Sequence, residues 1–195
     1  MELDFSKDNG LLPVIVQHWQ TGQVLMLGYM NSEAFVKTVA SDQVTFFSRS
    51  RNRLWTKGEE SGNFLHVKKM YPDCDNDTLL ILAEPAGPTC HRGTSSCFDN
   101  DEEVPFLFRL EAIIRDRYDN PVEGSYVNRL REKGLNKITQ KVGEEATETV
   151  IAALAQGRED LLDETSDLVF HLMVLLREKN ISLAELGDHL RKRHK

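Results

Sequence analysis

The spacing of apolar residues changes near residue 105, and this change limits the possible folds more than any other feature of the sequence. Before it, apolar residues form short runs between turns, as at 12–16 and 24–27. After it, Phe106, Leu110 and Ile113 recur at helical spacing. We therefore predict two domains, a strand-rich α+β domain followed by an all-helical bundle.

The predicted boundary follows residue 104, in an acidic stretch with too little apolar content to pack, and gives domains 1–104 and 105–195. In the first domain, the runs at 12–16 and 24–27 predict a hairpin, those at 44–47 and 79–82 predict two further strands, and Asn31 opens a helix. In the second, helices are predicted from 106, at 125–133, 139–156 and 159–178, and from Ser182, where Glu185 completes a capping box.

Composition excludes several classes of protein. The 195 residues carry a net charge of −7, which disfavours a surface that tracks a nucleic-acid backbone. No run approaches the roughly 20 apolar residues of a membrane helix, and the N-terminus MELDFSKDNG is unlike a signal peptide. The three cysteines are then expected to be thiols or metal ligands in a cytoplasmic protein, not disulfides.

Carboxylates cluster at Asp73, Asp75 and Asp77, with Cys74 among them. If this segment is extended, the three carboxylates share one face and the thiol lies on the other. The oxygens would then suit a hard cation such as Mg²⁺, and the sulfur a borderline one. The spacing also resembles half of an EF-hand, but a threonine stands where that loop needs glycine, and the flanks read as strands.

Two more cysteines, Cys90 and Cys97, lie in a glycine- and serine-rich loop. Three thiolates and one open position would match a catalytic zinc ion, which activates a water molecule. His91, beside one thiol, is then a candidate proton carrier. The competing interpretation is that all three cysteines are inert buried thiols.

The segment 47–63 interleaves basic residues with hydroxyls and glycines, a composition that suits phosphate binding. Within this segment, Trp55 could stack on a base. The candidate substrate-binding residues are Arg49, Arg51, Trp55, Lys57 and Ser61. A basic hairpin can equally be a solvated face.

The series SRSRNRLWTKGEESGN, DCDND and GPTCHRGTSSCF resembles the phosphoribosyl-AMP cyclohydrolases over most of residues 11–98. The resemblance implies a homodimer that opens the adenine ring of phosphoribosyl-AMP with zinc-activated water. It further implies that Cys74, Cys90 and Cys97 bind zinc, with Cys74 from the partner chain, and that the three aspartates bind Mg²⁺.

In the helical half, Glu145 and Glu148 are three residues apart, as are Glu164 and Asp167, so each pair shares a helix face. Each pair borders an apolar stripe. Acids there would converge in the bundle interior, where charges are costly unless they are paired or bound to a metal. A Mg²⁺ site explains the pattern, the alternative being solvated acids on a helix surface. Lys141 is a candidate phosphate ligand.

The chain from about residue 106 onward resembles the phosphoribosyl-ATP pyrophosphatases, most clearly in the segments SYVNRLREKGLNKITQKVGEEATE and DETSDLVFHLMVLL. The resemblance implies that Glu145, Glu148, Glu164 and Asp167 hold Mg²⁺ for attack between the α- and β-phosphates. The spacing does not decide whether Glu144 also binds the metal. It also does not decide whether His171 takes part in the reaction or only packs in the bundle.

Together the two resemblances predict a bifunctional enzyme of histidine biosynthesis, because the product of the second domain is the substrate of the first. Two alternatives remain at this point. One is a housecleaning nucleotide pyrophosphatase whose first domain only stores zinc. The other is a metal-dependent module that binds nucleotides without turnover.

Overall fold

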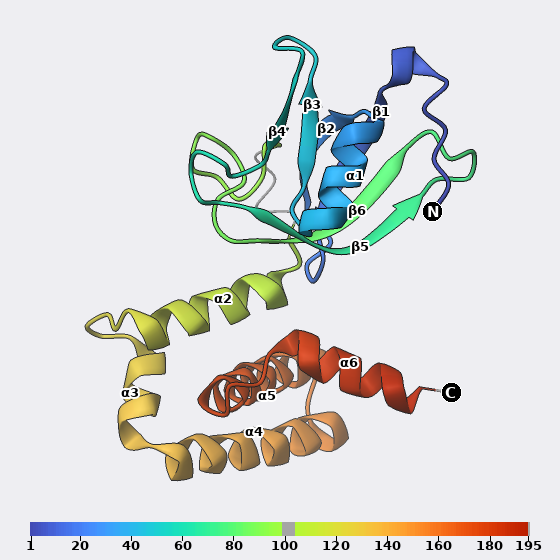
Figure 1. Ribbon diagram of the computed structural model, residues 1–195. Coiled ribbons are helices and arrows are strands. Elements are labelled where there is room, and N and C mark those ends of the chain that lie inside the picture. Colours follow the sequence, from blue (N-terminus) through green and yellow to red (C-terminus); the bar gives the residue numbers. More distant parts are fainter. Residues whose placement is uncertain (99–103, 195) are drawn as a thin grey trace. The chain divides into compact units, whose positions relative to one another are not determined.

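The computed structural model describes residues 1–98 and 104–194. The chain forms two compact units, Met1–Pro105 and Phe106–Lys195 (Figure 1). The first is rich in strands, and the second, in its described residues, contains helices and no strand, so the predicted fold classes are confirmed. Among the described helices, none has the length and apolar character needed to cross a bilayer.

The N-terminal domain is built on a four-stranded sheet with a separate hairpin. Its elements are η1 (Asp8–Gly10), β1 (Leu12–His18), β2 (Val24–Met30), α1 (Ser32–Ser41), β3 (Thr45–Ser48), β4 (Arg53–Thr56), β5 (Leu65–Pro72) and β6 (Leu79–Pro85). The sheet order is β2-β1-β6-β5, and β3 pairs with β4. Strands β1 and β6 pair in parallel, whereas β5 and β6 pair antiparallel; the predicted β1–β2 hairpin is antiparallel and therefore confirmed.

Alternating apolar residues form the core of this domain. Val14 and Val16 of β1 and Ile81 of β6 are fully buried, as period-two burial on one sheet face requires. The helix α1 begins after Asn31, whose side chain accepts the Ala34 N–H at 2.8 Å. It contacts β2 and β3 and thereby covers part of the core.

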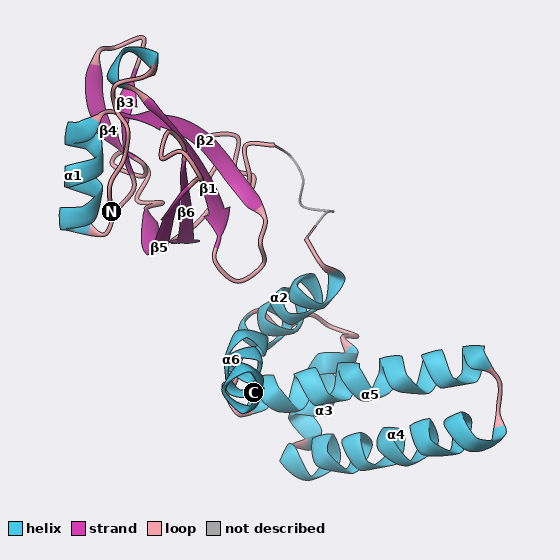
Figure 2. Cartoon of the chain, turned by 90° about the vertical axis from the view of Figure 1, so that its right-hand side faces the viewer, coloured by secondary structure: helices cyan, strands magenta, loops and turns pink. Residues whose placement is uncertain are grey.

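The C-terminal domain consists of α2 (Phe106–Asp119), α3 (Tyr126–Lys133), α4 (Leu135–Ala155), α5 (Arg158–Glu178) and α6 (Leu183–Arg193). The long helices α4 and α5 lie side by side as an antiparallel hairpin (Figure 2). Ile114, Leu130, Ile138 and Val174, from four different helices, are at most 2% exposed and form its core.

One helix boundary differs from its prediction. The helix predicted from residue 139 begins at Leu135, which places Ile138 in the core. Gly134 ends α3 and starts α4 with φ +80°, a left-handed conformation that glycine adopts without strain. The predicted capping box is confirmed: Ser182 Oγ accepts the Glu185 N–H at 3.2 Å, and Glu185 accepts the Ser182 N–H at 2.9 Å.

Candidate functional site

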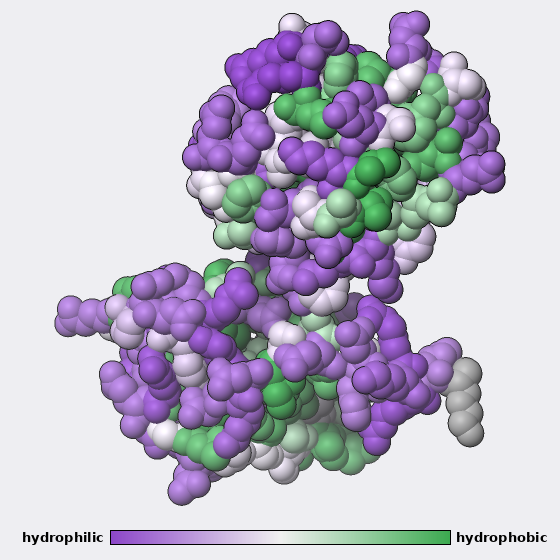
Figure 3. Space-filling view, in the orientation of Figure 1, coloured by the Kyte–Doolittle hydropathy of each residue, from purple (hydrophilic) through white to green (hydrophobic). Residues whose placement is uncertain are grey.

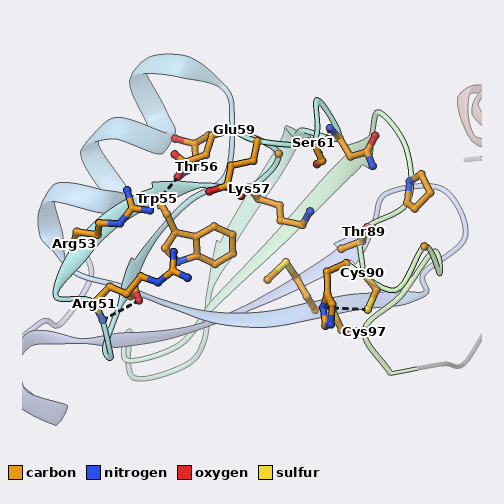
Figure 4. A pocket seen from close by; sticks show the side chains of 18 residues that line it. Arg51, Arg53, Trp55, Thr56, Lys57, Glu59, Ser61, Thr89, Cys90 and Cys97 are labelled. Carbon is orange, nitrogen blue, oxygen red and sulfur yellow. Dashed lines mark hydrogen bonds and ion pairs between the residues drawn. The ribbon is translucent and has the colours of Figure 1, made fainter.

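The N-terminal domain contains a cavity of about 600 Å³ between the β3–β4 hairpin and the cysteine loop. In Figure 4, Arg51 and Trp55 lie on one side, the thiols of Cys90 and Cys97 on the other, and Lys57 points into the space between them. The basic segment and the sulfur loop, separated in sequence, thus face one space. The lining includes four predicted substrate-binding residues, Arg51, Trp55, Lys57 and Ser61, and two residues that sequence reasoning missed, Arg53 and Glu59.

Arg53 and Glu59 form a polar wall of the cavity. Glu59 Oε2 accepts the Thr56 N–H at 2.9 Å, and its Oε1 lies 3.9 Å from the Arg53 guanidinium. Arg49 instead lies over the Tyr29 ring at 3.7 Å and does not line the cavity. Arg49 and Arg51 both belong to the turn between β3 and β4, where the alternation of a strand does not apply, so their side chains take different directions although they are two residues apart.

The position of Trp55 depends on close packing beneath it. Its ring lies 5.1 Å from the ring of Phe46, which is fully buried. Phe46 in turn sits directly on Gly28 of β2, where an added Cβ would overlap the phenyl ring. Glycine at this position therefore lets Phe46, and through it Trp55, take its place at the cavity.

The cysteine loop is held to the sheet edge by hydrogen bonds to carbonyl groups of β2. The Cys97 N–H donates to the Leu25 carbonyl at 2.8 Å, and Ser96 Oγ donates to the Val24 carbonyl at 2.8 Å. Within the loop, the Cys90 N–H donates to the Thr94 carbonyl at 3.0 Å. This folding brings Cys90 and Cys97 to one side of the cavity, although six residues separate them in sequence.

The two thiols differ electrostatically. A backbone N–H from Arg92 favours the thiolate and holds the pKa of Cys90 below its ordinary value. Burial, followed by the charge of Cys90, raises the pKa of Cys97. His91 is exposed, with Nδ1 3.9 Å from Cys90 Sγ.

Cys74 lies elsewhere in the same chain. It is exposed in the turn between β5 and β6 and is not a lining residue of the cavity. In the part of the chain that the structure describes, the thiols form no group of three potential metal ligands. Two thiols beside a cavity give an incomplete soft-metal donor set, so a zinc ion there needs a further ligand.

The aspartate segment is a turn, so the extended conformation considered from the sequence is wrong. Residues 74–77 form turn and bend structure, with Asn76 at φ +61°. Ligand oxygens of Asp73, Asp75 and Asp77 nevertheless lie within 4.8 Å of one another. The flanking elements are strands, which excludes an EF-hand. Three carboxylates with no sulfur or nitrogen among them fit a hard cation.

A lysine from the N-terminus reaches this turn. Lys7 Nζ lies 3.0 Å from Asp75 Oδ2 and 2.7 Å from Asp77 Oδ2. Asp73 is engaged differently, because its Oδ1 accepts the N–H groups of Asp77 and Thr78 at 3.0 Å each. The ion pairs with Lys7 join residues 68 and 70 positions apart, so no local pattern signals them.

In the helical domain, ligand oxygens of Glu145, Glu148 and Glu164 lie within 4.8 Å of one another. Glu145 is buried, at 3% exposure, and pairs with Lys141 Nζ at 2.5 Å. Partial burial, with the charges of Glu148 and Glu145, raises the pKa of Glu164. Crowded carboxylates of this kind fit a hard cation, which would relieve their repulsion.

Asp167 and His171 lie at the edge of this cluster. Asp167 is exposed and outside the group of three, although its charge also helps to raise the pKa of Glu164. His171 is buried, with Nδ1 2.8 Å from the Asp167 carbonyl and Nε2 3.0 Å from the Tyr126 hydroxyl. Because a carbonyl can only accept, Nδ1 donates the hydrogen bond to Asp167. These two bonds lock the ring 3.8 Å from Glu145.

Comparison with known proteins covers both domains. A family model described as phosphoribosyl-AMP cyclohydrolase matches residues 26–99, and one described as phosphoribosyl-ATP pyrophosphohydrolase matches residues 107–194. The "Histidine biosynthesis bifunctional protein HisIE" of Escherichia coli (strain K12) is 55% identical over 194 residues, which are 99% of this chain and 96% of the relative. Its counterpart from Bacteroides thetaiotaomicron is 56% identical over 196 residues, covering 100% and 97%.

A third relative, the protein of the same name from Salmonella typhimurium (strain LT2), is 53% identical over 194 residues, covering 99% of this chain and 96% of the relative. The two family models follow the same order as the two structural units, strand-rich first and helical second. The chain is therefore a hydrolase of the bifunctional histidine-biosynthesis family, with a phosphoribosyl-AMP cyclohydrolase domain followed by a phosphoribosyl-ATP pyrophosphohydrolase domain.

Proposed function

We propose that the two domains catalyse consecutive hydrolyses through the residues gathered at the cavity and at the helical carboxylates. The C-terminal domain cleaves phosphoribosyl-ATP between its α- and β-phosphates, which releases pyrophosphate and phosphoribosyl-AMP. The N-terminal domain then adds water at C6 of the adenine ring and breaks the N1–C6 bond. The observation that carries the assignment of ring opening to the N-terminal domain is the cavity lined by both a basic, aromatic hairpin and two thiols.

Substrate binding falls to the hairpin side of the cavity. The exposed face of Trp55 can stack on the purine ring, since its other side packs on Phe46. Arg51 and Lys57 supply cationic donors for phosphate oxygens, and Ser61 a hydroxyl. In the C-terminal domain, Lys141 supplies a cationic donor for phosphate oxygens beside the helical carboxylates. Arg49, engaged with Tyr29, has the least support among the predicted binding residues.

The ring-opening site is proposed to use zinc held by Cys90, Cys97 and the partner subunit's Cys74. The position of Cys74 outside the cavity supports donation across a dimer. When bound, zinc would lower the pKa of a water molecule toward neutrality and so supply a nucleophile. His91, 3.9 Å from Cys90 Sγ and exposed, is placed to carry a proton between the site and solvent.

Magnesium is proposed at both carboxylate groups. The aspartate turn offers Asp73, Asp75 and Asp77, and the helical site Glu145, Glu148 and Glu164, with Asp167 at its edge. When bound at the helical site, Mg²⁺ would neutralise phosphate oxygens and orient the attacked phosphorus. Lys141 forms ion pairs with Glu144 and Glu145, so its ammonium lies beside the proposed metal ligands and can bind a phosphate of the substrate there.

The homodimer, and a cytoplasmic location, are part of the proposal. Figure 3 shows apolar surface remaining on the mainly hydrophilic visible face. On the helical hairpin, Val150, Ile151 and Leu154 of α4 are 48–82% exposed, and Leu162 of α5 is 45% exposed. An apolar stripe of this kind on paired helices favours packing against a second copy.

Two variants separate the activities. Cys90→Ser should abolish ring opening and leave pyrophosphate release unchanged, because only the first site uses the thiol. Glu164→Gln should abolish pyrophosphate release and leave ring opening of supplied phosphoribosyl-AMP unchanged. Either variant retaining the activity it should lose would remove the corresponding site.

The rival housecleaning enzyme makes a different prediction for substrates. It would hydrolyse ordinary nucleoside triphosphates at least as well as phosphoribosyl-ATP. We expect kcat/KM for phosphoribosyl-ATP to exceed kcat/KM for ordinary nucleoside triphosphates by orders of magnitude.

A further inference from the structure

The N-terminal segment 1–11 is attached to the aspartate turn by both backbone and side chain. The Asp4 N–H donates to the Asn76 carbonyl at 2.8 Å. Lys7 Nζ contacts Asp77 at 2.7 Å and Asp75 at 3.0 Å. Two separate points of this segment thus hold one short turn.

The backbone around Lys7 is fixed on both sides. Before it, the Asp4 carboxylate accepts the Ser6 N–H at 2.9 Å and the Ser6 hydroxyl at 2.6 Å. After it, the Gly10 N–H donates to the Lys7 carbonyl at 3.0 Å. Phe5 also packs against the domain core. An anchored lysine loses less conformational freedom in an ion pair than one on a free surface segment, so the fold favours this contact.

The ammonium and a divalent cation would use the same oxygens. Mg²⁺ binds carboxylate oxygens at about 2.0–2.1 Å. A cation placed between Asp75 and Asp77 would therefore lie where the ammonium now makes both its contacts. Two positive charges so close together repel, and the oxygens cannot serve both fully. Occupation by the lysine and by the cation is thus mutually exclusive.

We propose that Lys7 is a built-in competitor that lowers the affinity of the aspartate turn for divalent cations. A cation binds there by displacing the ammonium, and the segment 1–11 loses one of its attachments. The inference rests on the magnesium site proposed above. It makes this site weaker and more readily exchanged than its three carboxylates alone would be.

The test uses full-length, isotope-labelled protein and Mn²⁺, whose paramagnetism broadens amide NMR signals near its binding site. The Asp77 and Thr78 amides report on the turn alone, separately from the helical carboxylates. The variants are Lys7→Met and a matched control, Lys68→Met, which removes the same charge from an ion pair with Glu84 elsewhere in this domain. The measured quantity is the Mn²⁺ concentration that halves these two signals.

We expect Lys7→Met to lower this concentration about 2- to 30-fold, the range for removing two exposed ion pairs, and Lys68→Met to leave it near the wild-type value. Diamagnetic Mg²⁺, which does not broaden these signals, should also speed hydrogen exchange of the Asp4 amide in the wild type. Equal midpoints in Lys7→Met and wild type, or a higher midpoint in the variant, would overturn the competition but leave the magnesium site. No selective broadening of the turn in any variant would overturn the magnesium site and the competition together.

Discussion

Lys141 holds the buried end of the helical carboxylate cluster, and we expect its removal to destabilise the C-terminal domain in a manner that Mg²⁺ corrects. Its ammonium lies 2.5 Å from Glu145, whose side chain is 4% exposed. In Lys141→Met the carboxylate keeps its burial and loses this partner. The nearest other basic group, His171 Nδ1, is 3.8 Å away and already bonded to a carbonyl.

The magnitude follows from burial. Breaking a fully buried ion pair by removing one partner costs about 3–5 kcal/mol. The Lys141 side chain is 23% exposed, so water can partly replace it at the carboxylate. We therefore expect a loss of about 1–3 kcal/mol in chelator, since exposed pairs contribute less than buried ones. With saturating Mg²⁺, the cation neutralises Glu145 and the loss should shrink to well below half.

The assay can resolve the two domains spectroscopically. Both tryptophans, Trp19 and Trp55, lie in the N-terminal domain, so tryptophan fluorescence during urea unfolding follows that domain. Helical ellipticity follows mainly the C-terminal domain, because α2 to α6 lie there and the N-terminal domain contributes the shorter helical segments η1 and α1. Lys137→Met is the matched control, because this lysine is on the same helix and bonds Gln140. An equal loss for Lys141→Met with and without Mg²⁺ would refute the reasoning.

Three other predictions concern the two sites. Mixing inactive Cys74→Ser and Cys90→Ser proteins should restore part of the ring-opening activity through mixed dimers; no recovery after confirmed subunit exchange would contradict a zinc site shared between subunits. Gly28→Ala should lower the stability of the N-terminal domain by about 1–3 kcal/mol through overpacking against Phe46 and raise KM for ring opening, whereas Gly187→Ala, in open space, should do neither. In chelator, the stability of the C-terminal domain should rise as pH falls from neutral toward the ordinary carboxyl pKa of 4.5, because the raised pKa of Glu164 makes the folded state bind a proton more tightly than the unfolded state. Glu164→Gln should flatten this pH dependence in thermal melts, and an unchanged slope in the variant would argue against the role of Glu164.

The sequence was most informative where local chemistry determines structure. Ser182 and Glu185 form the capping box that their spacing predicts, and Asn31 caps α1. The i, i+3 spacing of Glu145 and Glu148 places both in the carboxylate group with Glu164. In each case the interacting groups lie within one turn of a helix or on two adjoining helices.

Long-range contacts were not visible in the sequence. Strand β5 escaped prediction because Lys68 and Lys69 interrupt its apolar alternation and a register shift lies between Val67 and Lys69. The ion pairs of Lys7 depend on the parallel β1–β6 pairing and on the path of the N-terminal segment, neither of which has a local signal. The roles assigned to individual site residues stay predictions.

The central claim is that one chain carries two hydrolytic sites with different metals. The most direct test gives the purified protein phosphoribosyl-ATP and Mg²⁺ and follows pyrophosphate and ring-opened product separately, with and without a zinc-selective chelator. We expect pyrophosphate release to survive chelation while ring opening stops and phosphoribosyl-AMP accumulates. Loss of both products, or persistence of ring opening after verified removal of zinc, would contradict it.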